Sequence, residues 1–223
     1  MAIRIVDGHV DAQALKSMLM ARMTTEASLM LNLTAEQAAE ALRITMGYEV
    51  WKRASQYDGA EHSEARIQAL AKALATTGRK TGILLCGMPG NGKTTMMRSA
   101  IDVINAADVK DRYGRDIAIK EYSAKEIAMM NRESINEYRA VCNRPLLAID
   151  DLGEEPAETM DYGNIQSPMV DLIEHRYSHR LFTMITTNLT PKNIKEHYGA
   201  RVADRFDEMM NVIYFDNKSY RSQ

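Results

Sequence analysis

The sequence predicts an α/β protein in which a parallel sheet carries helices on both faces. From residue 81 onward, short apolar runs of strand length alternate with segments of helical periodicity. Such alternation is typical of parallel strands joined by crossover helices. The second observation is the glycine-rich segment GMPGNGKTT, residues 87–95, which lies between the first apolar run and the next helical segment. A phosphate-binding loop occupies this position in such sheets, so the two observations support each other.

Residues 1–64 are expected to form a small helical region that precedes this sheet. Thr34 begins a capping-box pattern with Gln37, which predicts a helix that contains the only tryptophan, Trp51. Three helices are expected in this part of the chain and at its border, over residues 12–32, 34–56 and 63–75. A turn is expected at residues 57–59.

Residues 65–223 are expected to form the α/β domain. Strands are predicted from apolar runs at residues 83–86, 117–122, 145–149, 182–187 and 212–215. Helices are predicted at residues 95–105, 123–139 with a break near 131–134, 164–177, from 191 onward, and 200–210. The acidic segment 153–163, with its glycine and proline, is expected to be a loop.

Composition limits the class of protein. The chain has 223 residues, 26% charged and 45% hydrophobic, with a formal net charge of −2. These are ordinary globular values, and any contact with nucleic acid must come from a local basic patch. Cys86 and Cys142 have no zinc or disulfide spacing, which predicts a reduced, cytoplasmic setting. No run approaches the ~18–20 apolar residues that span a bilayer, so no membrane association is expected.

The loop at residues 87–95 fits the pattern G-x-x-x-x-G-K-[ST] without a mismatch, through Gly87, Gly92, Lys93 and Thr94. Glycines allow successive backbone N–H groups to point at a phosphate, and the following helix adds its positive end. Lys93 is expected to neutralise the β- and γ-phosphates of ATP, and the Thr94 hydroxyl to hold Mg²⁺. The expected nucleotide-binding residues are Gly87, Met88, Pro89, Gly90, Asn91, Gly92, Lys93, Thr94 and Thr95.

The apolar run at residues 146–149 ends in two carboxylates, Asp150 and Asp151. The carboxyl end of a buried strand is where open α/β sheets bind ligands. Asp150 is expected to hold Mg²⁺ through water, and Asp151 to orient and deprotonate an attacking water. Asn188 follows another strand and can contact the γ-phosphate or that water. Its alternative role is to form a turn before Pro191.

Arg201 and Arg205 are four residues apart, so they share one face of a helix. An arginine offered to the γ-phosphate of a neighbouring subunit would be an arginine finger. Spacing alone favours a pair of surface arginines bridged to Asp204, Asp207 or Glu208.

Four segments together resemble the DnaC/IstB-like group of AAA+ ATPases, which are bacterial and phage helicase loaders and transposition helper ATPases. They are GMPGNGKTT (87–95), LLAIDDLG (146–153), TMITTNL (183–189) and GARVADRF (199–206). Residues 212–222 also resemble the end of a helicase loader, and the resemblance covers about residues 65–223. It implies a P-loop NTPase of AAA+ type, with a three-layer arrangement and no C-terminal helical lid domain.

The resemblance also implies roles for individual residues. Asp150 and Asp151 match the Walker B acids, and Asn188 matches the sensor-1 position. Arg205 matches the arginine finger, with Arg201 as second choice.

The resemblance also implies binding partners. Residues 1–64 would bind a protein partner, either a replicative helicase or a transposase. DNA, with the single-stranded form favoured, would be contacted by basic residues, for which the candidates are Lys120, Lys125 and Arg132. The alternative is a solvated helix face.

The function expected from these motifs is that of a Mg²⁺-dependent AAA+ helper ATPase of DNA replication or transposition. A helicase loader is the leading hypothesis. ATP would bind at subunit interfaces of a homo-oligomer and control its assembly on the partner and DNA. The alternatives are an IstB-type transposition helper, a P-loop kinase of small molecules or nucleotides, and a regulatory ATP-binding module with little turnover.

Overall fold

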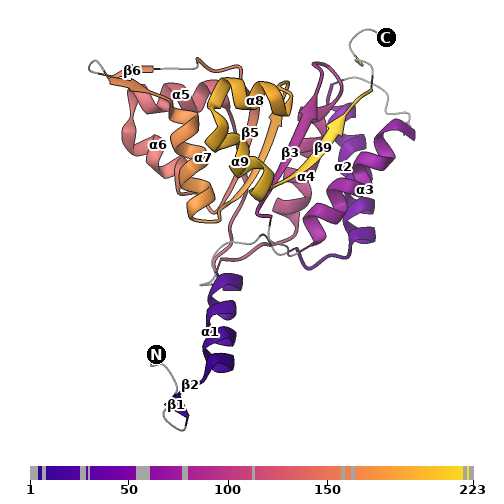
Figure 1. Cartoon of the computed structure of the whole chain (residues 1–223). Helices are drawn as coiled ribbons and strands as arrows, with labels where there is room; N and C mark the ends of the chain where they lie inside the picture. The colour runs from indigo at the N-terminus through magenta and orange to yellow at the C-terminus, as the bar shows by residue number, and fades with distance from the viewer. Residues whose placement is uncertain are drawn as a thin grey trace.

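Five parallel strands in the order β4-β5-β8-β3-β9 form the central sheet of the computed structural model (Figure 1). In that order the strands are Lys120–Ser123, Leu146–Leu152, Phe182–Thr187, Gly82–Gly87 and Met210–Phe215. The structure describes residues 5–6, 9–25, 29, 31–53, 61–76, 80–111, 114–156, 159–161, 164–217 and 220. The predicted α/β class is confirmed.

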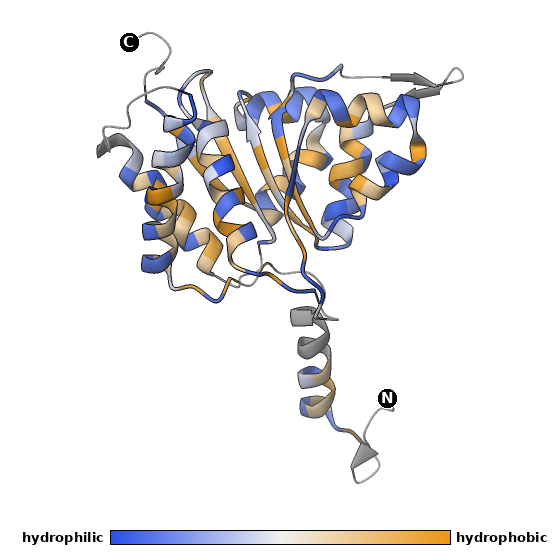
Figure 2. Ribbon diagram, turned by 180° about the vertical axis from the view of Figure 1, so that it is seen from behind, coloured by the Kyte–Doolittle hydropathy of each residue, from blue (hydrophilic) through white to orange (hydrophobic). Residues whose placement is uncertain are grey.

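Helices cover both faces of this sheet, because alternate residues of each strand point to opposite sides. In β3, Ile83 and Leu85 join one hydrophobic core, whereas Leu84 and Cys86 join the other. The first face carries α2 (Ala35–Trp51), α3 (Glu61–Ala75) and α4 (Lys93–Ala106). The second carries α5 (Ala124–Glu133), α6 (Ile135–Cys142), α7 (Pro168–Ser178), α8 (Pro191–Tyr198) and α9 (Ala200–Met209). Figure 2 shows hydrophobic residues concentrated in the strands between these layers.

The helix α2 begins as predicted. The Thr34 hydroxyl accepts from the Gln37 N–H at 3.2 Å, and the Gln37 side chain accepts from the Thr34 N–H at 2.9 Å. This helix packs on α3 and α4, and Leu42 and Met46 are buried in the same core as the sheet. The boundary at residue 64 stays a prediction. Helix α2, which lies before that boundary, packs in the same layer as α3 and α4 on the first face of the sheet.

The N-terminal segment contains the short strands β1 (Ile5–Val6) and β2 (His9–Val10), followed by α1 (Ala12–Thr25). Figure 1 shows α1 extending away from the layered part of the chain. The prediction that the first helix reaches residue 32 is wrong. Residues 31–34 are not helical, since Thr34 adopts the extended backbone that an N-cap requires (φ −70°, ψ 161°). Residues 54–60, which hold the predicted end of the second helix and a turn, lie outside the described residues.

Two further segments differ from the prediction. Strand β4 begins at Lys120 because residues 115–117 pair with residues 109–111 instead, with the Ile117 N–H donating to Val109 O at 2.9 Å. The expected loop and helix start at residues 153–166 contain an antiparallel hairpin, β6 (Thr159–Asp161) and β7 (Asn164–Gln166). Helix α7 therefore starts later, at Pro168, since proline suits the first helical turn.

The predicted helix break near residues 131–134 is confirmed at Ser134, whose extended backbone (φ −152°, ψ 89°) separates α5 from α6. In the described part of the chain, no helix combines the length and apolar character needed to cross a membrane.

Candidate functional site

The loop between β3 and α4 needs glycine at two positions for different reasons. A Cβ on Gly87 would lie 2.2 Å from the Phe215 carbonyl oxygen, so no side chain fits where β3 passes β9. Gly92 precedes the first helical residue with a left-handed backbone (φ 94°), which L side chains rarely adopt. These glycines bring the loop backbone to the amino end of α4, an arrangement that suits an anion.

The Lys93 ammonium is directed back into this loop. It is 5% exposed, and its Nζ lies 2.8 Å from Gly87 O, 2.8 Å from Met88 O and 3.2 Å from Asn91 Oδ1. A fourth oxygen, Asn188 Oδ1, accepts from Nζ at 2.8 Å. The last contact joins the loop after β3 to the end of β8, so Lys93 and Asn188 share one site although 95 residues separate them.

Asp150 lies at the end of β5, next to Thr94 in the first turn of α4. Its Oδ1 accepts from the Thr94 hydroxyl at 2.9 Å and from the Thr186 hydroxyl at 2.6 Å. Asp150 is 9% exposed, so this carboxylate is held by its two hydroxyl donors in a mostly buried position. Hydroxyl and carboxylate oxygens are the hard donors that Mg²⁺ uses together with substrate phosphates and water.

Asp151 is placed by an irregularity in β5. The pairing of β5 with β8 shifts register between Ile149 and Leu152, and Asp151 takes a left-handed backbone (φ 54°). Bulges of this kind re-aim a side chain near functional sites. The Asp151 N–H donates to the Thr186 hydroxyl oxygen at 2.8 Å, so a single threonine positions both acids.

Sequence reasoning missed Thr186 as a site residue. It is fully buried in β8, and its hydroxyl accepts from Asp151 while donating to Asp150. The available signal was a polar residue in a largely apolar strand, two positions before Asn188.

A buried carboxylate, Glu155, ties the loop after β5 to α8. Its Oε2 accepts from the Gly153 N–H at 2.8 Å, and its Oε1 accepts from the Tyr198 hydroxyl. Glu155 is 6% exposed. Burial, together with the neighbouring Glu155 carboxylate, raises the pKa of Tyr198. The Asp150–Asp151 segment is thereby connected to the end of α8, directly before the arginine-bearing α9.

Arg201 and Arg205 share a partner that the sequence did not indicate. Glu174 of α7 pairs with Arg201 Nε at 2.9 Å and with Arg205 Nη1 at 2.5 Å. The Arg201 side chain is 72% exposed, whereas Arg205 is 15% exposed and lies over the Tyr177 ring, 5.1 Å from its centroid. Of the two, Arg201 is therefore more accessible to a second molecule.

The three basic residues considered for DNA are exposed on β4 and α5. They are Lys120, Lys125 and Arg132. Of these, Lys125 pairs with Glu154 at 3.5 Å. Across the residues that the structure describes, no group of three or more His, Cys, Asp or Glu side chains could hold a metal ion.

Known proteins share both sequence and fold with this chain. The replicative helicase loader DnaI of Bacillus subtilis (strain 168) is 26% identical over 128 residues, which are 57% of this chain and 39% of that protein. The chain thus matches about two fifths of that relative's length. No protein-family model matches.

Solved structures of replication proteins share the fold. The DnaC helicase loader has a TM-score of 0.55 at 20% identity, covering 70% of this chain and 92% of that one. A DnaI structure has a TM-score of 0.55 at 18% identity, covering 81% and 92%. The replication initiator DnaA bound to AMPPCP and single-stranded DNA has a TM-score of 0.51 at 19% identity, covering 72% and 49%. The chain is thus similar in sequence to a helicase loader over 128 residues, and it shares the fold of these solved structures.

Proposed function

We propose that this chain is an AAA+ ATPase that assists DNA replication in the manner of a helicase loader. The observation that carries the proposal is the convergence of the ends of three strands. Lys93 meets Asn188, and Thr94 meets Asp150, at the carboxyl edge of the sheet. Lysine, hydroxyl, carboxylate and amide groups around a glycine loop are the set that binds and hydrolyses a nucleoside triphosphate.

Each group has a role in this proposal. The loop N–H groups of residue 88 and residues 90–94 and the amino end of α4 bind the β-phosphate, and Lys93 moves from the loop carbonyls to the β- and γ-phosphate oxygens. Thr94, and Asp150 through water, would hold Mg²⁺, which would supply positive charge beside the phosphates. Asp151 orients a water and accepts its proton, and Asn188 directs that water or the γ-phosphate.

The site is completed by a second copy of the chain. An arginine finger stabilises the transition-state charge of phosphoryl transfer, and α9 offers two candidates. The resemblance favours Arg205, whereas the 72% exposure of Arg201 favours Arg201. ATP binding would then join subunits, and hydrolysis would separate them.

The helicase-loader role is favoured over a transposition helper because the similar DnaI and DnaC are named as helicase loaders. Residues 1–64 are proposed to bind the helicase. Single-stranded DNA is proposed as a second ligand, since a DnaA of the same fold is bound to it, with Lys120, Lys125 and Arg132 as its contacts.

The test is ATP hydrolysis measured against protein concentration, with and without single-stranded DNA. The proposal expects a rate per subunit that rises with concentration, requires Mg²⁺, and is lost in Lys93→Ala. It also expects a fall of about 10³-fold or more in Arg201→Ala or Arg205→Ala. Arg139 is an exposed arginine on α6. The variant Arg139→Ala is the matched control and should keep the wild-type rate.

Other results would redirect the assignment. A rate independent of concentration and unchanged in both α9 variants would indicate a self-contained site and remove the shared-site mechanism. Transfer of the γ-phosphate to a nucleoside monophosphate would favour the alternative function, a P-loop kinase of small molecules or nucleotides.

A further inference from the structure

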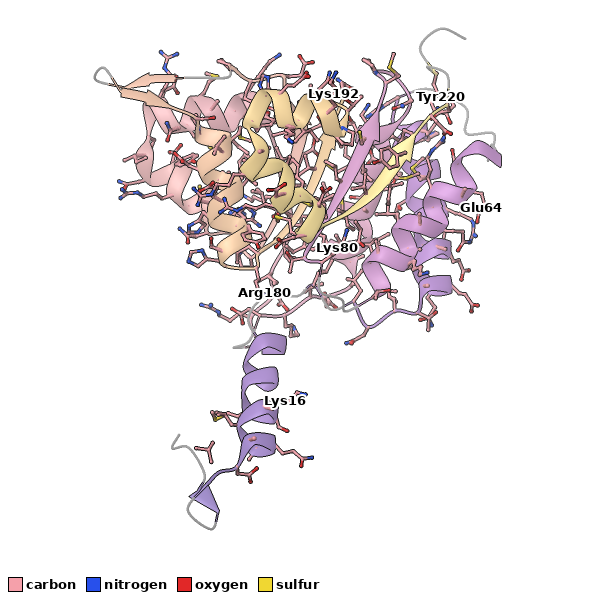
Figure 3. The ribbon with its side chains drawn as sticks, in the orientation of Figure 1. Lys16, Glu64, Lys80, Arg180, Lys192 and Tyr220 are labelled. Atoms are coloured by element: carbon pink, nitrogen blue, oxygen red, sulfur yellow. The ribbon has the colours of Figure 1, made fainter. Side chains whose placement is uncertain are left out.

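The chain after β9 returns across the phosphate-binding loop. The Asn91 side chain donates to Phe215 O at 2.8 Å, and Asn217 Nδ2 donates to Asn91 O at 3.3 Å. The Tyr220 N–H donates to Gly90 O at 2.9 Å. Three hydrogen bonds therefore connect the C-terminal segment to loop residues 90 and 91, and Figure 3 shows Tyr220 near the end of the sheet where β9 ends.

The start of this segment is also fixed from the other side. Arg66 of α3 donates to Tyr214 O at 3.2 Å, pairs with Asp216 at 2.6 Å, and lies over the Phe215 ring. Arg66 is 8% exposed. Residues 214–216 are thus held by α3, and residue 220 is held by the loop.

The Tyr220 ring lies against the loop at Gly92. Its Cε2 atom is 3.3 Å from the point that a Cβ on Gly92 would occupy, so the absence of a side chain there lets the ring approach the backbone. Tyr220 nevertheless remains 43% exposed. An aromatic surface therefore stands beside the backbone proposed to bind phosphate.

We infer that Tyr220 is the stacking residue for the base of the bound nucleotide. This inference rests on the proposed ATP site. A base is joined to its phosphates only through a ribose, so it must lie near the loop that holds them. Aromatic rings stack on nucleobases, and every base offers a π face for this contact. The C-terminal segment would thus supply the base contact, while the loop supplies the phosphate contacts.

The experiment compares two probes on full-length protein by calorimetry, ATP with Mg²⁺ and inorganic tripolyphosphate with Mg²⁺. Tripolyphosphate has the phosphates without the base. Tyr220→Ala is expected to weaken ATP binding about 5- to 100-fold and to change tripolyphosphate binding less than twofold. Tyr220→Phe keeps the ring and should match the wild type with both probes. Since the contact to Gly90 uses the backbone N–H, Tyr220→Ala retains it.

Equal losses for both probes in Tyr220→Ala would show that Tyr220 only supports the loop, and would overturn the inference. No loss for either probe would also overturn it. Lys93→Ala should weaken both probes together. If the wild type bound neither probe, the proposed function itself would fail and the inference with it, a result distinct from a selective failure at Tyr220.

Discussion

Replacing Thr186 by valine tests whether one hydroxyl positions both acids of the site. Valine has nearly the same shape but lacks the hydroxyl, so it removes two hydrogen bonds while keeping the packing of β8. The bonds lost are the 2.6 Å donation to Asp150 and the 2.8 Å acceptance from the Asp151 N–H. Because Thr186 is fully buried, water does not easily replace its hydroxyl.

The magnitude follows from these two bonds. A hydrogen bond to a charged group contributes about 1.5–3 kcal/mol, and an N–H that loses its acceptor inside the protein costs about 1–3 kcal/mol. Allowing for relaxation, Thr186→Val should lower the free energy of unfolding by about 2–5 kcal/mol. For a chain of this size, a loss of about 3 kcal/mol lowers the Tm by about 6–12 °C. If the acids also move, Mg²⁺-dependent hydrolysis should fall about 10- to 100-fold.

Thermal and urea unfolding, followed by circular dichroism, measure the stability, and phosphate release measures hydrolysis. Thr186→Ser keeps the hydroxyl and removes one methyl group, so it should lose about 1 kcal/mol and keep most of the activity. A Thr186→Val protein with the wild-type Tm would refute the reasoning. Equal damage in the serine variant would assign the effect to the methyl group.

Two further predictions concern stability. Arg201→Ala should change the free energy of unfolding by less than about 1 kcal/mol, because the ion pair of Arg201 with Glu174 is exposed. Arg205→Ala should lower the free energy of unfolding by about 1–2 kcal/mol, because the contacts of Arg205 with Glu174 and Tyr177 are more buried. Equal urea midpoints for the two variants would contradict this ordering. Burial, and then the neighbouring Glu49 carboxylate, raise the pKa of Asp102. Its contribution to stability is present below the unfolded pKa of about 3.9 and is lost as pH rises through the higher folded pKa. Asp102→Asn should therefore be more stable than wild type at pH 7, with a difference that shrinks at acidic pH; a difference independent of pH would argue against the shift.

Sequence patterns predicted the layered part of the fold well because its elements depend on local spacing. Strand β3, the α4 helix and strand β8 lie where apolar runs and periodicity placed them. The hairpin β6–β7 was missed because its strands are only three residues long and occur in a polar segment. A strand this short has too few alternating positions to be distinguished from a loop.

The sequence by itself pointed to the glycine-rich loop, the paired acids and the strand-end asparagine as a candidate site, because each is a short pattern at the end of one apolar run. Only the tertiary structure decided which residues meet. Asp150 contacts Thr186 because β5 and β8 are neighbours in the sheet. The same holds for Glu155 with Tyr198, for Glu174 with the two arginines, and for the return of Tyr220 to Gly90. These contacts join residues that are about 30 to 130 positions apart in the sequence. Strand order, register and crossover direction bring such residues together, and a local sequence pattern encodes none of these three properties.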